Sequence, residues 1–192
     1  MVGGFSESPM LQKRIQESVP QDKKFIIPKE PGLAVLKGAV IFGHNPLVIE
    51  ARRARYTYGV GTSVIFEEGT HPDSRRITSV DGEDYCTDIF DEHVTIGQEL
   101  VFGKTNMDRE YSPLNKDQER MTFAFYASTD PNPAFVTDAN CTEIGQFTVD
   151  LADSDDDRAF SVTMVFGDTE LHAEAVEMAT GMKTKCVLYF LG

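Results

Sequence analysis

The hydrophobic positions of the first fifty residues repeat with helical spacing. Leu11, Ile15 and Val19 recur every four residues along one stretch, which is the period of an amphipathic helix. Ser8 and the proline after it precede this stretch. Serine accepts bonds from free N–H groups at a helix start, and proline lacks only an N–H that would be unpaired there. The pattern predicts a helix over residues 8–19.

A second apolar stripe follows a proline-rich connection. Leu33, Leu36 and Val40 share one helical face, and the spacing predicts a helix that begins near residue 29 and stops at Gly43. Between the two helices, the apolar residues 25–27 are expected to form a short buried strand.

Beyond residue 47 the period changes from helical to alternating. Phe160, Val162, Met164 and Phe166 all point to one side of an extended chain. Runs rich in aromatic and β-branched residues predict strands at 56–61, 63–67, 85–90, 99–102, 121–128, 143–151, 160–166, 171–178 and 184–191. Strands 160–166 and 171–178 are expected to form a hairpin, whereas the polar residues 103–120 are interpreted as an exposed loop.

This change of period predicts two domains and an α+β fold class. Residues 1–50 form the helical part and residues 51–192 a mainly antiparallel β-sandwich, because many short strands are separated by turn signals. The junction is expected near residues 51–55.

Composition and charge narrow the classes of partner. The chain has 192 residues, of which 41% are hydrophobic and 26% charged, with a net charge of −13. This charge argues against nucleic acid and against anionic membrane surfaces, since both need clustered Lys and Arg. No apolar run approaches the roughly 20 residues that span a bilayer. Cys86, Cys141 and Cys186 are odd in number and widely spaced, which favours reduced thiols and a cytoplasmic location.

Motifs that carry catalytic or metal chemistry are weak. The stretch 97–105 resembles a phosphate-binding loop, but its spacing has one residue too many. The acids of 153–157 alternate as in a calcium loop, but Arg158 stands where glycine is needed and Met164 where the bidentate glutamate is needed. The four histidines share no ligand spacing with the cysteines. We therefore expect no metal site and no enzymatic activity of this chain, which is interpreted as a binding or structural module.

The glycine pair Gly3-Gly4 before the first helix permits two interpretations. It is either a plain connection between a strand and a helix, or a turn where the backbone comes close to a ligand.

Several motifs, in this order and spacing, resemble the seventy-kilodalton heat-shock chaperones of the DnaK type. They are Val2-Gly-Gly-Phe-Ser-Glu-Ser-Pro9, Pro31-Gly-Leu-Ala-Val-Leu-Lys-Gly-Ala39, Tyr56-Thr-Tyr-Gly-Val-Gly-Thr62, Thr95-Ile-Gly97, Met121-Thr-Phe-Ala-Phe-Tyr126, Ile144-Gly-Gln-Phe147 and the hairpin 160–181. The arginine-rich junction and residues 165–170 are most similar to the divergent twelve-A/B branch, which has no helical lid.

The resemblance implies the C-terminal part of such a chaperone. It implies the tail of an actin-like ATPase lobe, with the order strand–helix–strand–helix, followed by a substrate-binding sandwich. The phosphate loops and the catalytic and metal-linked residues of the family have no counterpart in this sequence.

The resemblance also implies two sets of site residues. The adenosine-binding turn corresponds to Gly3, Gly4, Ser6 and Glu7, although Glu7 stands where the family has an arginine. The peptide groove corresponds to Val60, Thr62, Phe102, Met121 and Phe123, with Glu170 at a position where the family is apolar. From the residues alone, the apolar groove cluster could equally be sandwich core.

The function that the resemblance implies is binding of unfolded or extended apolar polypeptide segments. ATP or ADP would regulate this binding only in a longer protein, and no cofactor is expected for this chain alone. The alternative is a non-enzymatic scaffold that binds other proteins and whose groove no longer takes peptides. Glu170 favours the scaffold.

Overall fold

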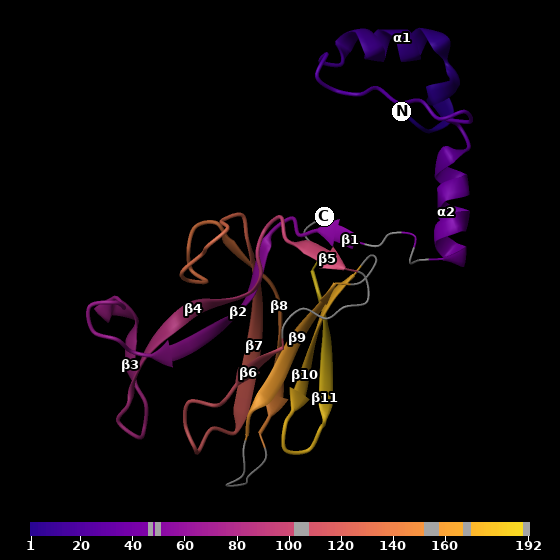
Figure 1. Cartoon of the computed structure of the whole chain (residues 1–192). Coiled ribbons are helices and arrows are strands. Elements are labelled where there is room, and N and C mark those ends of the chain that lie inside the picture. The colour runs from indigo at the N-terminus through magenta and orange to yellow at the C-terminus, as the bar shows by residue number, and fades with distance from the viewer. Residues whose placement is uncertain (46–47, 49–50, 102–107, 152–157, 167–169, 190–192) are drawn as a thin grey trace. The chain divides into compact units, whose positions relative to one another are not determined.

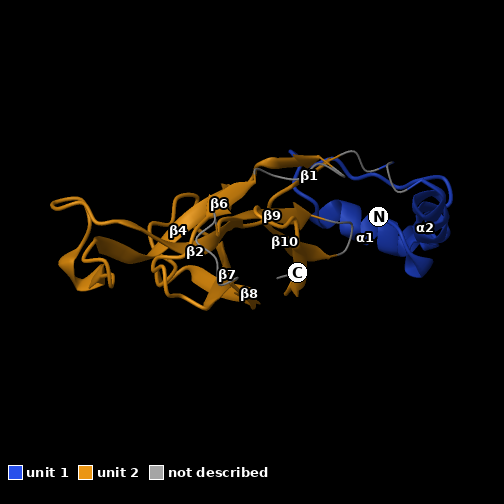
Figure 2. Cartoon of the chain, turned by 90° about the horizontal axis from the view of Figure 1, so that it is seen from below, with its two compact units in different colours: residues 1–50 blue, residues 51–192 orange. Residues whose placement is uncertain are grey.

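The computed structural model describes residues 1–45, 48, 51–101, 108–151, 158–166 and 170–189 (Figure 1). The chain divides into two compact units, Met1–Glu50 and Ala51–Gly192, which Figure 2 shows in different colours.

The described residues of unit 1 include the following helical segments. They are a short 3-10 helix Gly4–Glu7, helix α1 Pro9–Ser18 and helix α2 Ala34–His44. Helix α1 confirms the predicted helix, with Pro9 as its first residue. Helix α2 begins later than predicted, because residues 29–33 form a turn in which the Leu33 N–H donates to the Glu30 carbonyl.

The two strands predicted in unit 1 are wrong for the described residues. Residues 1–2 and 25–27 are not part of any ladder. One bond joins the two segments, from the Met1 amino group to the Ile26 carbonyl at 2.6 Å, and a second lies beside them, from the Gly3 N–H to the Pro31 carbonyl at 2.9 Å. Such short segments offer too few bonds for a stable ladder. The interpretation of this unit as the tail of an actin-like lobe stays a prediction.

Unit 2 is built from antiparallel strands in three sheets. The strands are β1 Ala51–Arg53, β2 Thr57–Ile65, β3 Arg76–Thr78, β4 Asp84–Val94, β5 Glu99–Val101, β6 Arg109–Tyr111, β7 Arg120–Ser128, β8 Cys141–Asp150, β9 Phe160–Phe166, β10 Leu171–Glu177 and β11 Lys183–Leu188. The five-stranded sheet has the order β3-β4-β2-β7-β8 and the four-stranded sheet the order β11-β10-β9-β6, while β1 pairs with β5. This arrangement is consistent with the predicted sandwich.

Aromatic side chains from both larger sheets form the core between them. The Phe123 ring of β7 contacts the Phe160 ring of β9 edge-to-face at 5.7 Å, and Tyr58 of β2 contacts Phe166 of β9 at 5.2 Å. The predicted alternation of strand 160–166 is confirmed, because Phe160, Val162 and Met164 are buried.

The hairpin of β9 and β10 is also confirmed, with Phe160 opposite Glu177 and Phe166 opposite Leu171. The interpretation of residues 103–120 as an exposed loop is wrong in part. Residues Arg109–Tyr111 form β6, which pairs with β9, and Tyr111 is buried. A three-residue strand gives almost no periodic signal, and the partner strand that stabilises it lies fifty residues away.

Candidate functional site

Two neighbouring strands of the five-stranded sheet separate and leave a fork. Strands β2 and β7 pair from Thr57 opposite Ser128 to Val60 opposite Phe125. Beyond Val60, β2 continues along β4, while the facing part of β7 continues along β8. The register of the β2–β7 pair therefore ends in the middle of both strands.

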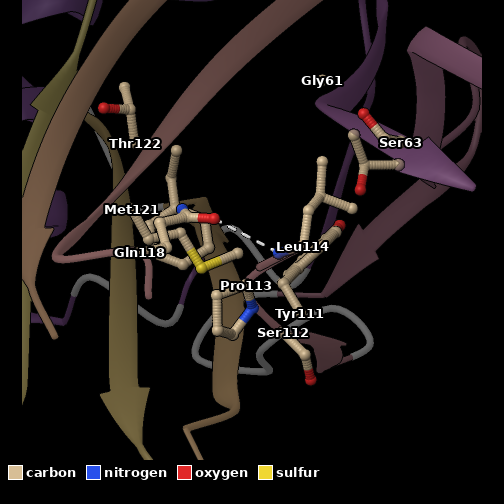
Figure 3. A pocket seen from close by; sticks show the side chains of 11 residues that line it. Gly61, Ser63, Tyr111, Ser112, Pro113, Leu114, Gln118, Met121 and Thr122 are labelled. Carbon is tan, nitrogen blue, oxygen red and sulfur yellow. Dashed lines mark hydrogen bonds between the residues drawn. The ribbon is translucent and has the colours of Figure 1, made fainter. Parts of the chain in front are cut away.

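A pocket of about 160 Å³ lies in this fork (Figure 3). Its lining comes from both diverging strands, from β6 and from the segment that follows β6. The lining residues are Gly61, Thr62, Ser63, Tyr111, Ser112, Pro113, Leu114, Gln118, Met121, Thr122 and Phe123. The pocket thus combines apolar side chains with hydroxyl and amide groups.

Hydrogen bonds hold the segment 112–118 along one side of the pocket. The Gln118 side-chain oxygen accepts from the Leu114 N–H at 3.2 Å, as Figure 3 shows, and its amide nitrogen donates to the Arg120 carbonyl at 2.6 Å. The Arg158 guanidinium donates to the carbonyls of Lys116, at 2.6 Å, and of Gln118. These bonds order a segment that has no regular secondary structure.

A buried polar cluster anchors Tyr111, one of the lining residues. Its hydroxyl donates to Asp91 Oδ2 at 2.7 Å and lies 2.9 Å from Nε2 of His93. Since the hydroxyl proton goes to the carboxylate, His93 donates its Nε2 proton to the tyrosine oxygen. The Nδ1 atom of His93 is then an acceptor, and it has no partner among the described residues.

Burial sets the protonation of this cluster. His93 is 2% exposed, and desolvation of the charged form lowers its pKa to about 4. Burial and the bond to Asp91 raise the pKa of Tyr111 far above its usual value. At neutral pH, both rings are uncharged and act as fixed hydrogen-bonding groups rather than as an acid and a base.

The structure brings together three of the five predicted groove residues. Thr62, Met121 and Phe123 line the pocket. Val60 is 1% exposed, lies in the core and does not line the pocket. Phe102 lies outside the described residues.

Glu170 is exposed and does not line the pocket. The prediction from resemblance that it enters the groove is therefore not supported by its position. This removes the observation that favoured the scaffold at the sequence level.

Sequence reasoning missed the lining residues that follow β6. Tyr111, Pro113 and Leu114 stand in a polar stretch that was interpreted as an exposed loop. The run Tyr-Ser-Pro-Leu was the available signal, because a cluster of large apolar residues inside a polar stretch indicates a local contact with the core.

The four residues of the predicted adenosine turn lie together at the start of unit 1. Gly3 has φ = +102°, which favours glycine, and Gly4 begins the 3-10 helix that ends at Glu7. Ser6 is buried, and its hydroxyl donates to the Gly3 carbonyl. A Cβ atom placed on Gly4 would meet no atom within 4 Å. Their role in nucleotide binding stays a prediction.

The described residues contain neither a metal-binding cluster nor a membrane-spanning helix. No group of three or more His, Cys, Asp or Glu in them could hold a metal ion, and none of their helices is long and apolar enough to cross a bilayer.

Comparison with known proteins identifies homologues over the whole length of this chain. Heat shock 70 kDa protein 12A is 36% identical in the human form and 37% in the mouse form, over 196 residues. Human heat shock 70 kDa protein 12B is 33% identical over 202 residues. Each alignment covers 100% of this chain. The chain is a homologue of heat shock 70 kDa proteins 12A and 12B.

This homology confirms the resemblance to the seventy-kilodalton heat-shock family and its twelve-A/B branch. The chain spans about 29% of the length of these relatives. No family model matches the chain.

Proposed function

We propose that unit 2 binds extended apolar polypeptide segments at the fork between β2 and β7. The observation that carries this proposal is the end of the β2–β7 register at Val60 and Phe125. An interrupted register leaves backbone N–H and C=O groups on two facing strand edges, and an added extended chain can use such groups.

The size of the pocket supports a side chain as its occupant. Its volume of about 160 Å³ is below the ~300–1,000 Å³ of pockets that enclose small molecules. Met121, Leu114 and Pro113 supply apolar contacts, while the hydroxyls of Thr62 and Ser63 lie at the same pocket. One apolar side chain of a bound segment would enter, and its backbone would lie along the fork.

The experiment measures binding of a fluorescently labelled apolar heptapeptide to the full chain by anisotropy. Met121→Gln keeps the side-chain length but adds a polar amide, and we expect roughly tenfold weaker binding, from ~1–1.5 kcal/mol of lost apolar contact. Met178→Gln is the matched control, because Met178 is 48% exposed and does not line the pocket. Equal loss in both variants, or no saturable binding by the unmodified chain, would contradict the proposal.

A second candidate is a scaffold that binds folded proteins and no longer takes peptides. The burial of Val60 and Phe123, both 1% exposed, favours it, because these two predicted groove residues are packed into the core. The same titration separates the candidates, since a scaffold binds no apolar heptapeptide.

We also propose that ATP or ADP acts only in longer homologues, where the turn of Gly3, Gly4, Ser6 and Glu7 contributes to the nucleotide pocket. The space around Gly4 supports a clean test, because the side chain of Gly4→Val would meet no neighbour of this chain within 4 Å at its Cβ. Weaker ATP binding in the longer protein would then report contact with the nucleotide. Unchanged affinity would make the turn purely structural. This chain alone is expected to show no ATP hydrolysis above background. The proposed partners of unit 2 are cytoplasmic polypeptides.

A further inference from the structure

A second and larger cavity lies at one end of the sandwich and is lined by other residues than the pocket of the fork. Its volume is about 500 Å³, and its lining residues come from the ends of β8, β9 and β10 and the start of β11. They are Thr148, Val149, Asp150, Leu151, Phe160, Glu177, Thr180, Met182 and Thr184. This volume falls within the ~300–1,000 Å³ that is typical of small-molecule sites.

Two carboxylates line this cavity; Asp150 is exposed and pairs with Arg120 at 3.0 Å, whereas Glu177 is buried. Glu177 is 8% exposed, whereas Thr180 and Met182 are exposed. Buried and exposed residues alternate along β10, and Glu177 falls on the buried face with Leu171, Ala173 and Ala175. The strand period therefore directs Glu177 towards the core and the cavity rather than to solvent.

The described residues provide no positive charge for this carboxylate. None of their Lys, Arg or His side chains forms an ion pair with Glu177, and the nearby Lys183 and Lys185 both pair with Glu174. The Arg158 guanidinium is bonded to the carbonyls of Lys116 and Gln118. Burial of an unpaired charge is costly unless a partner compensates it.

A turn holds the carboxylate in place. The Thr180 hydroxyl donates to Glu177 Oε2 and accepts from the Met182 N–H at 3.2 Å. Oε1 accepts no hydrogen bond from the residues that the structure describes. One oxygen is thus fixed by the hairpin turn, while the other remains available to a ligand.

Protection of a sheet edge does not explain the inward charge. Inward charges can block edge-to-edge association of strands, but β10 lies between β9 and β11 and has no free edge.

We propose that this cavity binds a small organic cation, a primary ammonium group on an apolar chain. The ammonium would pair with Glu177, and the chain would contact Val149, Leu151 and Phe160, which line the same cavity. The proposal concerns other residues than peptide binding at the fork, because the two sets of lining residues have no member in common, although Thr122 of the fork bonds to Thr148 of this cavity.

The test titrates the full chain with n-hexylammonium and, as a neutral isostere, with 1-hexanol. Amide chemical shifts of residues 177–184 in NMR spectra report binding at the cavity. We expect saturable shifts there with the ammonium and roughly tenfold weaker binding of the alcohol, since only the cation pairs with the carboxylate. Equal affinity for both, or no saturable shifts with the ammonium, would overturn the proposal.

Two variants and one further probe sharpen this result. Glu177→Gln removes the charge at nearly constant shape and should bring the ammonium down to the affinity of the alcohol, while Glu170→Gln, at an exposed acid, should leave it unchanged. An unchanged affinity in Glu177→Gln overturns the proposal. The comparison of the two probes on the unmodified chain needs no variant to fold. Stronger binding of Nα-acetyl-lysine methylamide than of hexylammonium would overturn the small amine as ligand and assign the cavity to a lysine side chain.

Discussion

The two units treat their apolar residues in opposite ways. In unit 2, seventeen of the described residues form one buried hydrophobic cluster, and no described residue of unit 1 belongs to it. In unit 1, large apolar side chains stay in contact with water, with Phe5 85% exposed and Leu36 of helix α2 63% exposed. Helix α2 has no buried residue at all.

This contrast shows that a local sequence pattern can specify a helix, whereas stability of the fold requires burial of apolar side chains. The described helices of unit 1 follow from spacing and propensity and have no side-chain N-caps, and short isolated helices are marginal in water. Hydrophobic burial is the dominant favourable term in folding. We therefore expect unit 2 to carry nearly all of the measurable folding stability of this chain.

The largest difference is expected from truncating a phenylalanine in each unit. Phe125→Ala removes a ring that is 0% exposed and should lower the free energy of unfolding by ~3–5 kcal/mol. Phe5→Ala is the matched change in unit 1 and should stay within ~0.5 kcal/mol, because an exposed ring gains nothing on folding. Urea denaturation of both variants measures this, and comparable losses would show that unit 1 has a core of its own.

The next largest effect is the pH dependence of folding stability that His93 gives to unit 2. His93 has a pKa of about 4 in the folded state, against 6.5 for an unperturbed histidine. The unfolded chain therefore binds more protons between these values. The contribution of His93 to stability is complete above about pH 6.5 and is lost as pH falls towards 4, by on the order of 3 kcal/mol in total.

Urea denaturation between pH 7 and pH 4 measures this contribution. His93→Gln should flatten the fall in stability over this range. A slope equal to that of the unmodified chain would contradict the buried neutral His93.

Two glycine-to-alanine substitutions are expected to change stability by a smaller amount and in opposite directions. In Gly59→Ala, the new Cβ would lie 2.4 Å from the Asp91 carbonyl oxygen and 2.4 Å from the Phe90 ring, so we expect a loss of ~1–3 kcal/mol from overpacking. In Gly38→Ala, the new Cβ meets nothing within 4 Å, and the higher helix propensity of alanine should stabilise α2 by ~1 kcal/mol. Thermal melting checks the first change and far-ultraviolet circular dichroism the second. A loss of helix signal in Gly38→Ala would show that α2 is packed closely at this position.

The smallest difference concerns ion pairs. Glu174 of β10 pairs with Lys183 at 2.8 Å and with Lys185 at 2.7 Å. The hydrogen bonds that it accepts, first from Lys183 and second from Lys185 in order of effect, lower the pKa of Glu174. Glu30 of unit 1 pairs with Lys37. Glu174→Gln should cost up to ~1 kcal/mol and less at high salt, while Glu30→Gln should cost nothing measurable. Thermal melts at low and high salt compare the two. A larger cost for Glu30→Gln would contradict the proposed contrast between the units.

The sequence by itself determined the elements that have a strong local signal. Helix α1 follows from Pro9 at its first position and the four-residue repeat, although the Ser8 side chain makes no capping hydrogen bond. The hairpin of β9 and β10 follows from alternation along residues 160–166. The family also followed from the sequence, because ordered motifs along the whole chain carry it without any coordinates. These features depend on neighbours in the chain, where side-chain period and backbone preference act directly.

Only the tertiary structure decided the features that depend on distant partners. Strand β6 exists because β9 pairs with it, and Tyr111 enters the pocket because Asp91 and His93 fix its hydroxyl. Thr62 and Met121 line the same pocket only because the β2–β7 register ends at Val60. Val60 itself is buried in the core. The alternation along β10 places Glu177 on the buried face, but the cavity beside it exists only because the ends of four strands come together. Such contacts are set by packing between segments far apart in the chain, and no local pattern encodes them.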